Sequence, residues 1–450
     1  MYMNKIAFIG FGEVNTPTEL IVKKCTAARA SLEKEGLSLL SIFPVTDDEA
    51  GSDVQQTIDT LQTEDFDTLV LCIAGWIPAH AVVSVAEKFR HKPMVLWGLC
   101  GWMEEGRLVT TADQAGTSAL RKTLADLGYC FKYVYDIIGK PSKSKDVADF
   151  AIASEAAARL RGAKVGMAGY RDMRLYGTLY DGVSLKRITG VEIETFEMLE
   201  MYQIYEQIEQ SEKQKIVDYM LKNWHFIKEA NPESLLIAAG YFLAVKQLID
   251  TRGYGAVSLK DLDGMKKLLK FPPAPVFTLL CDILKVSAIP ENDCLGNVTQ
   301  LMVKYLTGQC GAYLEFYEFF DDRVLAGVPD FVPTEIVDGE VIVMPAAFGE
   351  LSEGVLNVSK VRTGLLTMCR LVYTDGRYYM HMVTGQGVTP RKWEEAGWTQ
   401  PAPQLPGLEI LLDNTEAFTQ NVMCQHYIIT YGDNTKRICD LCKILGIEVI

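Results

Sequence analysis

The sequence has few histidines and no strongly basic segment. Only 5 of its 450 residues are His, so any chemistry that needs an imidazole depends on a handful of positions. The formal net charge is −14, and an acidic chain repels phosphate backbones, which disfavours nucleic-acid binding. The densest basic stretch, Lys140–Lys145, is short and broken by Pro and Ser. Such a segment is typical of a solvated loop.

Long apolar runs and a secretory leader are also lacking. No apolar run approaches the roughly 20 residues that cross a bilayer, and Met1–Lys5 leads directly into the apolar Ile6–Ile9. The 11 cysteines are scattered among apolar segments, so we expect reduced thiols in a soluble cytoplasmic protein. Cys439 and Cys442 form a single CxxC inside a helical pattern, and we expect buried thiols on one helix face there rather than a zinc site.

The first third of the chain alternates between strand and helix patterns. Lys5–Gly10, Asp67–Ala74 and Pro93–Trp97 are short apolar runs, and amphipathic segments separate them. Continuous apolar strands between amphipathic helices indicate a parallel sheet that is covered on both faces. We therefore predict an N-terminal α/β domain over residues 1–155.

The same pattern begins again after a linker-like stretch at residues 139–145. Ala163–Ala168 and Val191–Phe196 read as strands, and a long helical region over roughly 200–250 contains a break at Asn231–Pro232. Residues 156–330 are predicted to form a second α/β domain.

The C-terminal part of the sequence has hairpin patterns in place of alternating strands and helices. Glu335–Met344 has the pattern of a hairpin with an Asp338–Gly339 turn, and a second hairpin is predicted around Thr374–Gly376. Residues 331–450 are predicted to form a β-rich, barrel-like domain that ends with a helix near 434–445. The predicted fold class is therefore α/β, with two Rossmann-like parallel-sheet domains followed by this β-rich domain.

A glycine pair follows the first predicted strand. Gly10 and Gly12 match the first two glycines of a dinucleotide-binding fingerprint, but Asn15 stands where the third glycine belongs. A tight strand-to-helix turn is therefore the interpretation that we favour for the pair. We expect no nucleotide cofactor.

Two acids and one histidine lie within or between apolar segments of the sequence. Glu291 lies between two apolar helical patterns, Glu315 lies within an apolar run, and His426 lies in an apolar strand that leads to Gly432. His381, in an alternating strand, is expected to be simply packed. A buried carboxylate costs several kcal/mol unless it is paired, hydrogen-bonded or bound to a metal. From the residues alone, a salt-bridged core acid or a helix cap is a better interpretation of each acid than a metal ligand.

These positions resemble the L-fucose/L-arabinose isomerase family. The run from Pro290 to Val298 (PENDCLGNV) is similar to the family segment with the first metal-binding glutamate. Glu315 holds the place of the second acid, which is aspartate in the fucose branch, and His426 that of the C-terminal histidine. The stretch 344–348 (MPAAF) lacks the additional histidine of the arabinose branch, so the site should follow the fucose pattern. The resemblance implies a divalent cation, usually Mn²⁺, held by Glu291, Glu315 and His426.

The resemblance also implies a reaction. An aldose–ketose isomerase moves a proton between two sugar carbons through a cis-enediol(ate), and the family assigns the proton transfers to the two metal-binding acids, here Glu291 and Glu315. Aromatic rings pack against sugar C–H faces, so Trp76 and Trp393 are proposed substrate contacts, and Gln425 is a further one. A homo-oligomer, hexamer or trimer, is implied by the family.

Two other functions stay open at this point. A metal-dependent sugar epimerase or lyase could use the same enediolate. A non-catalytic sugar-binding protein could also contain two successive α/β domains, and it would need no metal-binding triad.

Overall fold

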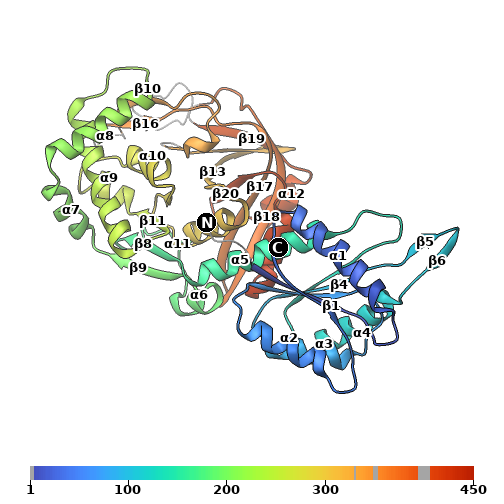
Figure 1. Cartoon of the computed structure of the whole chain (residues 1–450). Coiled ribbons are helices and arrows are strands. Elements are labelled where there is room, and N and C mark those ends of the chain that lie inside the picture. The colour runs from blue at the N-terminus through green and yellow to red at the C-terminus, as the bar shows by residue number, and fades with distance from the viewer. Residues whose placement is uncertain (1–4, 329–330, 348–352, 394–405) are drawn as a thin grey trace. The chain divides into compact units, whose positions relative to one another are not determined.

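The computed structural model describes residues 5–328, 331–347, 353–393 and 406–450. The chain divides into two compact units. The first contains residues 1–158 and 439–445, and the second contains residues 159–438 and 446–450 (Figure 1).

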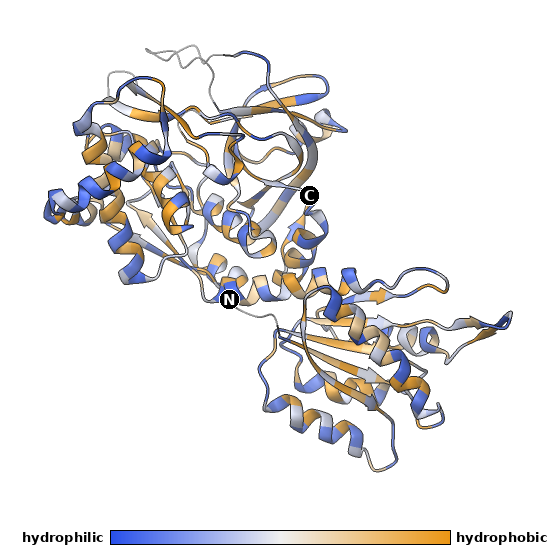
Figure 2. Cartoon of the chain, turned by 45° about the horizontal axis from the view of Figure 1, so that its top comes forward, coloured by the Kyte–Doolittle hydropathy of each residue, from blue (hydrophilic) through white to orange (hydrophobic). Residues whose placement is uncertain are grey.

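The first unit is built on a five-stranded parallel sheet with the strand order β2-β1-β3-β4-β7. Such an order belongs to the doubly wound class, in which helices cover both faces. Strands β1, β3 and β4 are almost wholly buried, which explains their continuous apolar sequence. In Figure 2 they are coloured mainly as hydrophobic. The strands are β1 (Lys5–Phe11), β2 (Ser38–Val45), β3 (Thr68–Ile73), β4 (Met94–Gly98) and β7 (Phe131–Tyr135).

Helices connect these strands, and a short hairpin projects from the same unit. The apolar faces of the helices pack on the sheet, as the alternation of strand and helix patterns predicted. The helices are α1 (Thr18–Lys34), α2 (Ser52–Gln62), α3 (Ala79–Lys88), α4 (Asp113–Asp126) and α5 (Ser144–Arg161), and the hairpin strands are β5 (Trp102–Glu104) and β6 (Arg107–Val109).

The second unit contains a four-stranded parallel sheet with the order β12-β11-β8-β9. The predicted second parallel sheet is thus confirmed. Its strands are β8 (Lys164–Ala168), β9 (Glu192–Phe196), β11 (Ala256–Leu259) and β12 (Ser287–Ile289). Its helices are α6 (Gly182–Thr189), α7 (Met198–Gln207), α8 (Gln210–Asn223), α9 (Pro232–Arg252), α10 (Ala274–Leu279) and α11 (Cys294–Thr307).

Helix α9 begins where the sequence predicted a break. The Asn231 side chain accepts a hydrogen bond from the Glu233 amide, and Pro232 occupies the first helical turn. With 21 residues, α9 is long and apolar enough to cross a membrane by length and composition alone, so the expectation that no such run exists was wrong. Its most apolar stretch is 61% buried inside the second unit, where it packs in the hydrophobic core.

Six antiparallel strands of the second unit form a closed barrel. They follow the order β17-β20-β13-β14-β19-β18, and pairing of β17 with β18 closes the ring. The Asp375–Gly376 turn between β17 and β18 has positive φ at both residues, as a two-residue hairpin requires, and confirms the predicted hairpin. The barrel strands are β13 (Ala312–Phe319), β14 (Arg323–Gly327), β17 (Gly364–Thr374), β18 (Arg377–Val388), β19 (Gly407–Leu411) and β20 (His426–Tyr431).

The barrel starts earlier in the chain than the sequence indicated. Strands β13 and β14 lie before residue 330, where a domain boundary was predicted, yet they pair with β20 and β19, which follow it. The predicted hairpin at 335–344 was wrong. Thr334–Ile336 is a 3₁₀ turn, and β15 (Ile342–Ala347) instead pairs with β16 (Glu353–Asn357) and β10 (His225–Phe226). Alternation specifies a strand but not its partner.

The helix near the C-terminus, α13 (Thr435–Leu445), lies where it was predicted. Its CxxC does not place both thiols in the core, however. Cys442 is buried, whereas Cys439 is exposed. A short strand, β21 (Glu448–Val449), then pairs in parallel with β18.

Candidate metal centre

The turn after β12 holds Glu291 in an unusual backbone conformation. Glu291 and Asn292 have φ values of 63° and 51°, a left-handed conformation that costs a non-glycine residue roughly 1–2 kcal/mol. Hydrogen bonds to the neighbouring strand region hold the turn. The Glu291 amide donates to Asp261 Oδ1 (2.7 Å), and the Asn292 amide donates to the Leu259 carbonyl (3.1 Å). The turn lies at the carboxyl end of a parallel strand, where α/β sheets place ligands.

Asp293 fixes the other side of this turn. Its carboxylate caps α11 by accepting from the Gly296 amide (3.0 Å) and from the Tyr313 hydroxyl (2.9 Å). Arg370, on barrel strand β17, donates to both of its oxygens at 2.5 and 2.9 Å. Burial alone would raise the pKa of Asp293, but the charge and hydrogen bonds of Arg370 outweigh it, and the pKa is lowered. The parallel sheet is thereby tied to the barrel through a fully buried ion pair.

Barrel strands supply the other two predicted ligands. Glu315 on β13 and His426 on β20 are directly opposite in the antiparallel register, so their side chains lie on one face of the sheet. Glu315 Oε2 is 3.5 Å from His426 Nε2, and Glu291 Oε2 is 3.5 Å from His426 Nδ1. The structure thus brings together the three side chains that the sequence placed far apart.

The His426 imidazole is buried and stacks on an aromatic ring. Its ring stacks on Tyr313 with a centroid separation of 4.2 Å and an interplanar angle of 14°. Burial lowers the pKa of His426 to about 3 despite the nearby charge of Asp293. A neutral imidazole is the form that binds metal ions.

Carboxylates dominate the charge around Glu291. Burial, together with the neighbouring charges of Asp261, Glu315 and Asp293, raises the pKa of Glu291 well above its ordinary value. Lys266 pairs with Asp261, and Arg370 pairs with Asp293. Glu291 Oε2 is buried and makes no hydrogen bond to any described residue.

The donor set suits a hard or borderline divalent cation, since it combines carboxylate oxygens and one imidazole. The side-chain positions do not yet form a coordination sphere. Among the described residues, no group of three His, Cys, Asp or Glu side chains is arranged to hold a metal ion. One ion binds one ring nitrogen, whereas the two glutamates face different nitrogens of His426. The residues fit a cation in chemistry and burial, and binding of one ion by all three would require a glutamate or the ring to change its orientation.

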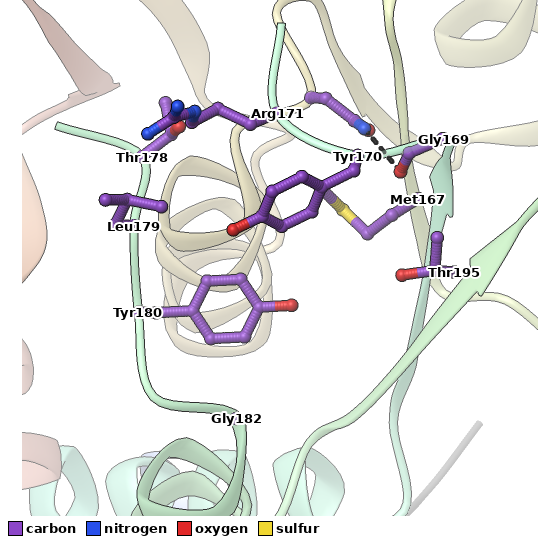
Figure 3. Close-up of a pocket in the computed structure, with 10 residues that line it drawn as sticks. Met167, Gly169, Tyr170, Arg171, Thr178, Leu179, Tyr180, Gly182 and Thr195 are labelled. Atoms are coloured by element: carbon purple, nitrogen blue, oxygen red, sulfur yellow. Dashed lines mark hydrogen bonds between the residues drawn. The ribbon is translucent and has the colours of Figure 1, made fainter. Parts of the chain in front are cut away.

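A pocket of about 220 Å³ adjoins the Glu291 turn through Asn292. It opens at the carboxyl ends of β8 and β9, and Figure 3 shows the rings of Tyr170 and Tyr180 facing it, with Thr195 on the strand side. Asn292 Nδ2 donates to the carbonyls of Ala168 (3.3 Å) and Gly169 (2.7 Å), which fixes the orientation of the amide. Its buried Oδ1 has no partner among the described residues.

The three proposed substrate contacts lie in different places. Trp393 packs in the second unit against Tyr317 (centroid separation 4.6 Å), two residues beyond Glu315. Its buried indole nitrogen lacks a hydrogen-bond acceptor within the described ranges. Gln425 is exposed, and its carbonyl accepts from the Phe316 amide (3.1 Å). Trp76 is 40% exposed and belongs to the first unit. All three roles stay predictions.

Sequence reasoning missed the residues that hold the site together. Asp261, Asn292, Asp293, Tyr313 and Arg370 were not singled out. Arg370 gave the clearest signal, because a lone charge inside an apolar strand must find a partner once it is buried. His381 is packed, as expected: Nδ1 lies 2.6 Å from the Tyr427 hydroxyl.

Comparisons with known proteins add little. No protein-family model matches the chain, and no curated protein matches it. Among solved structures, a periplasmic solute-binding protein of an ABC transporter from Actinobacillus succinogenes 130z, with bound D-allose, is similar at 14% sequence identity. The match covers 68% of this chain and 92% of that one, with a TM-score of 0.17. At that TM-score the similarity supports no conclusion about fold or function.

Proposed function

We propose that the chain is a metal-dependent aldose–ketose isomerase that acts on a monosaccharide or a modified sugar. One observation carries the proposal. A buried glutamate oxygen without a hydrogen-bond partner in the described structure, Glu291 Oε2, lies 3.5 Å from His426, and Glu315 lies at the other ring nitrogen. Two carboxylates that share a buried imidazole are the donors of a divalent cation site, for which we propose Mn²⁺.

The proposed chemistry divides between the cation and the chain. When bound, a divalent cation held by Glu291, Glu315 and His426 would supply Lewis-acid polarisation of the substrate carbonyl. Glu291 and Glu315 approach His426 from different sides, one from the turn after β12 and one from the barrel. One carboxylate can take the proton from the sugar carbon while the other handles the proton on oxygen. His426, whose ring stacks on Tyr313, would help to hold the cation.

The adjoining pocket is the proposed place for the rest of the sugar. Asn292 Oδ1 offers an acceptor to a hydroxyl group, and the rings of Tyr170 and Tyr180 offer surfaces for the C–H faces. Asn292 is the immediate neighbour of Glu291, so a sugar in the pocket would extend toward the proposed cation. Trp393, Gln425 and Trp76 are proposed as further contacts. The protein is proposed to be cytoplasmic and homo-oligomeric.

A screen of substrates tests this proposal. The purified chain is incubated with Mn²⁺ and a panel of aldoses in deuterated water, and NMR follows the ketose and the incorporation of deuterium. Isomerisation through an enediol predicts a ketose with solvent deuterium on its new C–H bond. Glu291→Gln and Glu315→Gln should each abolish turnover, whereas Glu318→Gln, an exposed acid on the same strand, should retain it.

The alternatives give other results. A recovered aldose with inverted C2 would identify an epimerase. A sugar that binds but stays unchanged and unlabelled with Mn²⁺ present would identify a sugar-binding protein. Near-normal turnover in Glu291→Gln or Glu315→Gln, at saturating Mn²⁺, would remove that residue from the mechanism.

A further inference from the structure

Two cysteines of the second unit, Cys281 and Cys310, lie in contact. Cys281 Sγ and Cys310 Sγ are 3.9 Å apart and hydrogen-bonded. Cys281 lies in the π-helical turn Leu280–Leu284, and Cys310 lies in the connection between α11 and β13. Short π-helical segments are frequent at functional sites. The second unit thus holds two thiols that a modest approach would join.

Solvent reaches this pair through a pocket of about 140 Å³. Both cysteines line the pocket, together with Lys285, Lys304 and Glu335. Cys310 is half-buried, and Cys281 is 6% exposed. Cys310 is therefore the more accessible thiol of the pair, and Cys281 is the more buried one.

The surroundings give the two thiols different reactivity. Their shared hydrogen bond lowers the pKa of Cys310 and raises that of Cys281. Burial and the charge of Glu335 oppose this effect on Cys310, and the Lys304 ammonium adds to it. The thiolate is the nucleophile in cysteine chemistry. Cys310 is thus the candidate nucleophile that attacks an oxidant, and Cys281 is the candidate thiol that then reacts with the oxidised Cys310.

We propose that Cys281 and Cys310 form a redox-active pair that hydrogen peroxide converts into a reversible disulfide. The Cys310 thiolate attacks one peroxide oxygen, the O–O bond breaks, and with one proton the products are a sulfenic acid and water. The Cys281 sulfur then attacks the sulfenic sulfur, forms the S–S bond and releases a second water. In sum, two thiols and one peroxide give one disulfide and two waters, and a thiol reductant reverses the oxidation.

The disulfide would act on the segments that lead to both catalytic glutamates. Cys281 lies shortly before β12, which ends at the Glu291 turn, and Cys310 is followed by Gly311 and by β13 with Glu315. Closing the gap from 3.9 Å to a bond of about 2.05 Å would rotate the two side chains and crosslink the two segments. The oxidation itself depends only on the thiols, so it can occur whether or not the proposed isomerase activity is correct.

A second thiol pair serves as an internal control. Cys25 and Cys72 in the first unit also share a hydrogen bond, but both are 0% exposed. Contact between thiols is thus common to both pairs, and solvent access distinguishes them. The accessible pair should oxidise while the enclosed pair stays reduced.

The test uses the full-length chain and peptide mapping. The reduced protein is treated with equimolar hydrogen peroxide, free thiols are blocked with iodoacetamide, and trypsin digestion proceeds without reductant. Trypsin separates Cys281 (residues 271–285) from Cys310 (residues 305–323), and each of these peptides has a single cysteine. Mass spectrometry should find the two peptides joined, with the loss of two hydrogens, and dithiothreitol should separate them. The crosslink should form to a roughly tenfold greater extent than oxidation of Cys25 or Cys72.

Two variants test whether the crosslink requires this particular pair of thiols. Cys439→Ser removes an exposed thiol outside the pair and should leave the crosslink unchanged. Cys281→Ser should abolish it and leave a Cys310 sulfenic acid that dimedone traps. Recovery of both wild-type peptides with blocked cysteines, or of Cys310 as sulfinic acid without a crosslink, overturns the proposal. Equal oxidation of Cys25 and Cys72 would overturn it as well.

Discussion

Glu315 and His426 lie directly opposite each other on the adjacent antiparallel strands β13 and β20. Register in a closed barrel fixes this pair without help from a loop. Replacing Glu315 by Gln keeps the size of the side chain and removes the charge that a divalent cation requires. We expect Mn²⁺ affinity to fall by more than the roughly 10–100-fold that loss of an outer-shell partner costs. Isothermal titration calorimetry of the variant and the wild type with Mn²⁺ measures this affinity.

The matched control for this variant is Glu318→Gln. Glu318 lies on the same strand and is exposed, so its loss should leave Mn²⁺ affinity and the melting temperature unchanged. Equal affinity in Glu315→Gln and in the wild type would contradict a ligand role for Glu315. A parallel fall in both variants would point to non-specific binding by surface acids.

The ion pair between Asp293 and Arg370 gives a prediction about stability. Both side chains are 0% exposed, so removing one charge leaves the other uncompensated in the interior. We expect Asp293→Asn to lower the free energy of unfolding by about 3–5 kcal/mol, measured by urea denaturation. Asp126→Asn, which breaks the exposed pair with Lys122, should cause no measurable change. A small effect of Asp293→Asn would show that the pair does not tie the sheet to the barrel.

Local patterns predicted much of the fold. The strands β1, β3, β4 and β8 lie where apolar runs placed them, because a strand buried on both faces is apolar throughout. Pairing between distant strands could not be predicted in this way. The sequence around β13 contains no information that its neighbour is β20, more than 100 residues later. The β-rich domain was therefore predicted to begin at residue 331, although its first strand, β13, begins at Ala312.

The candidate site was predictable only in part. Glu291, Glu315 and His426 were found through a family resemblance, and the structure brings them together. The left-handed turn at Glu291 and Asn292 has no glycine to mark it. It exists because bonds to Asp261 and Leu259 offset its strain, and those partners come from another part of the chain.

Asn292 gives a prediction about the pocket, which rests on the proposed function. Glycine accepts the left-handed φ of 51° without strain, so Asn292→Gly removes the amide and keeps the backbone conformation. We expect KM for the sugar to rise roughly tenfold, as for one lost hydrogen bond, with a smaller change in kcat. Lys270→Gly, at an exposed left-handed position outside the pocket, should leave both constants unchanged. An unaltered KM in Asn292→Gly would place the sugar elsewhere.

The barrel contains an acid whose contribution to stability depends on pH. Glu409 on β19 accepts hydrogen bonds from Arg323 and Arg391. The Arg391 hydrogen bonds, aided by those from Arg323, outweigh the effect of burial and lower the pKa of Glu409 to about 2. An unfolded glutamate has a pKa of about 4.3.

Because the folded pKa lies below the unfolded one, the stabilisation is fully present above about pH 4.3 and is lost as the pH falls toward 2. Glu409→Gln should therefore lower the free energy of unfolding by about 1–2 kcal/mol at pH 7. The difference from the wild type should shrink between about pH 4.3 and pH 2. Urea titrations at several pH values measure this difference, with Glu318→Gln as the exposed control. A difference that stays constant over that range would show that Glu409 stabilises the barrel by packing rather than by its charge.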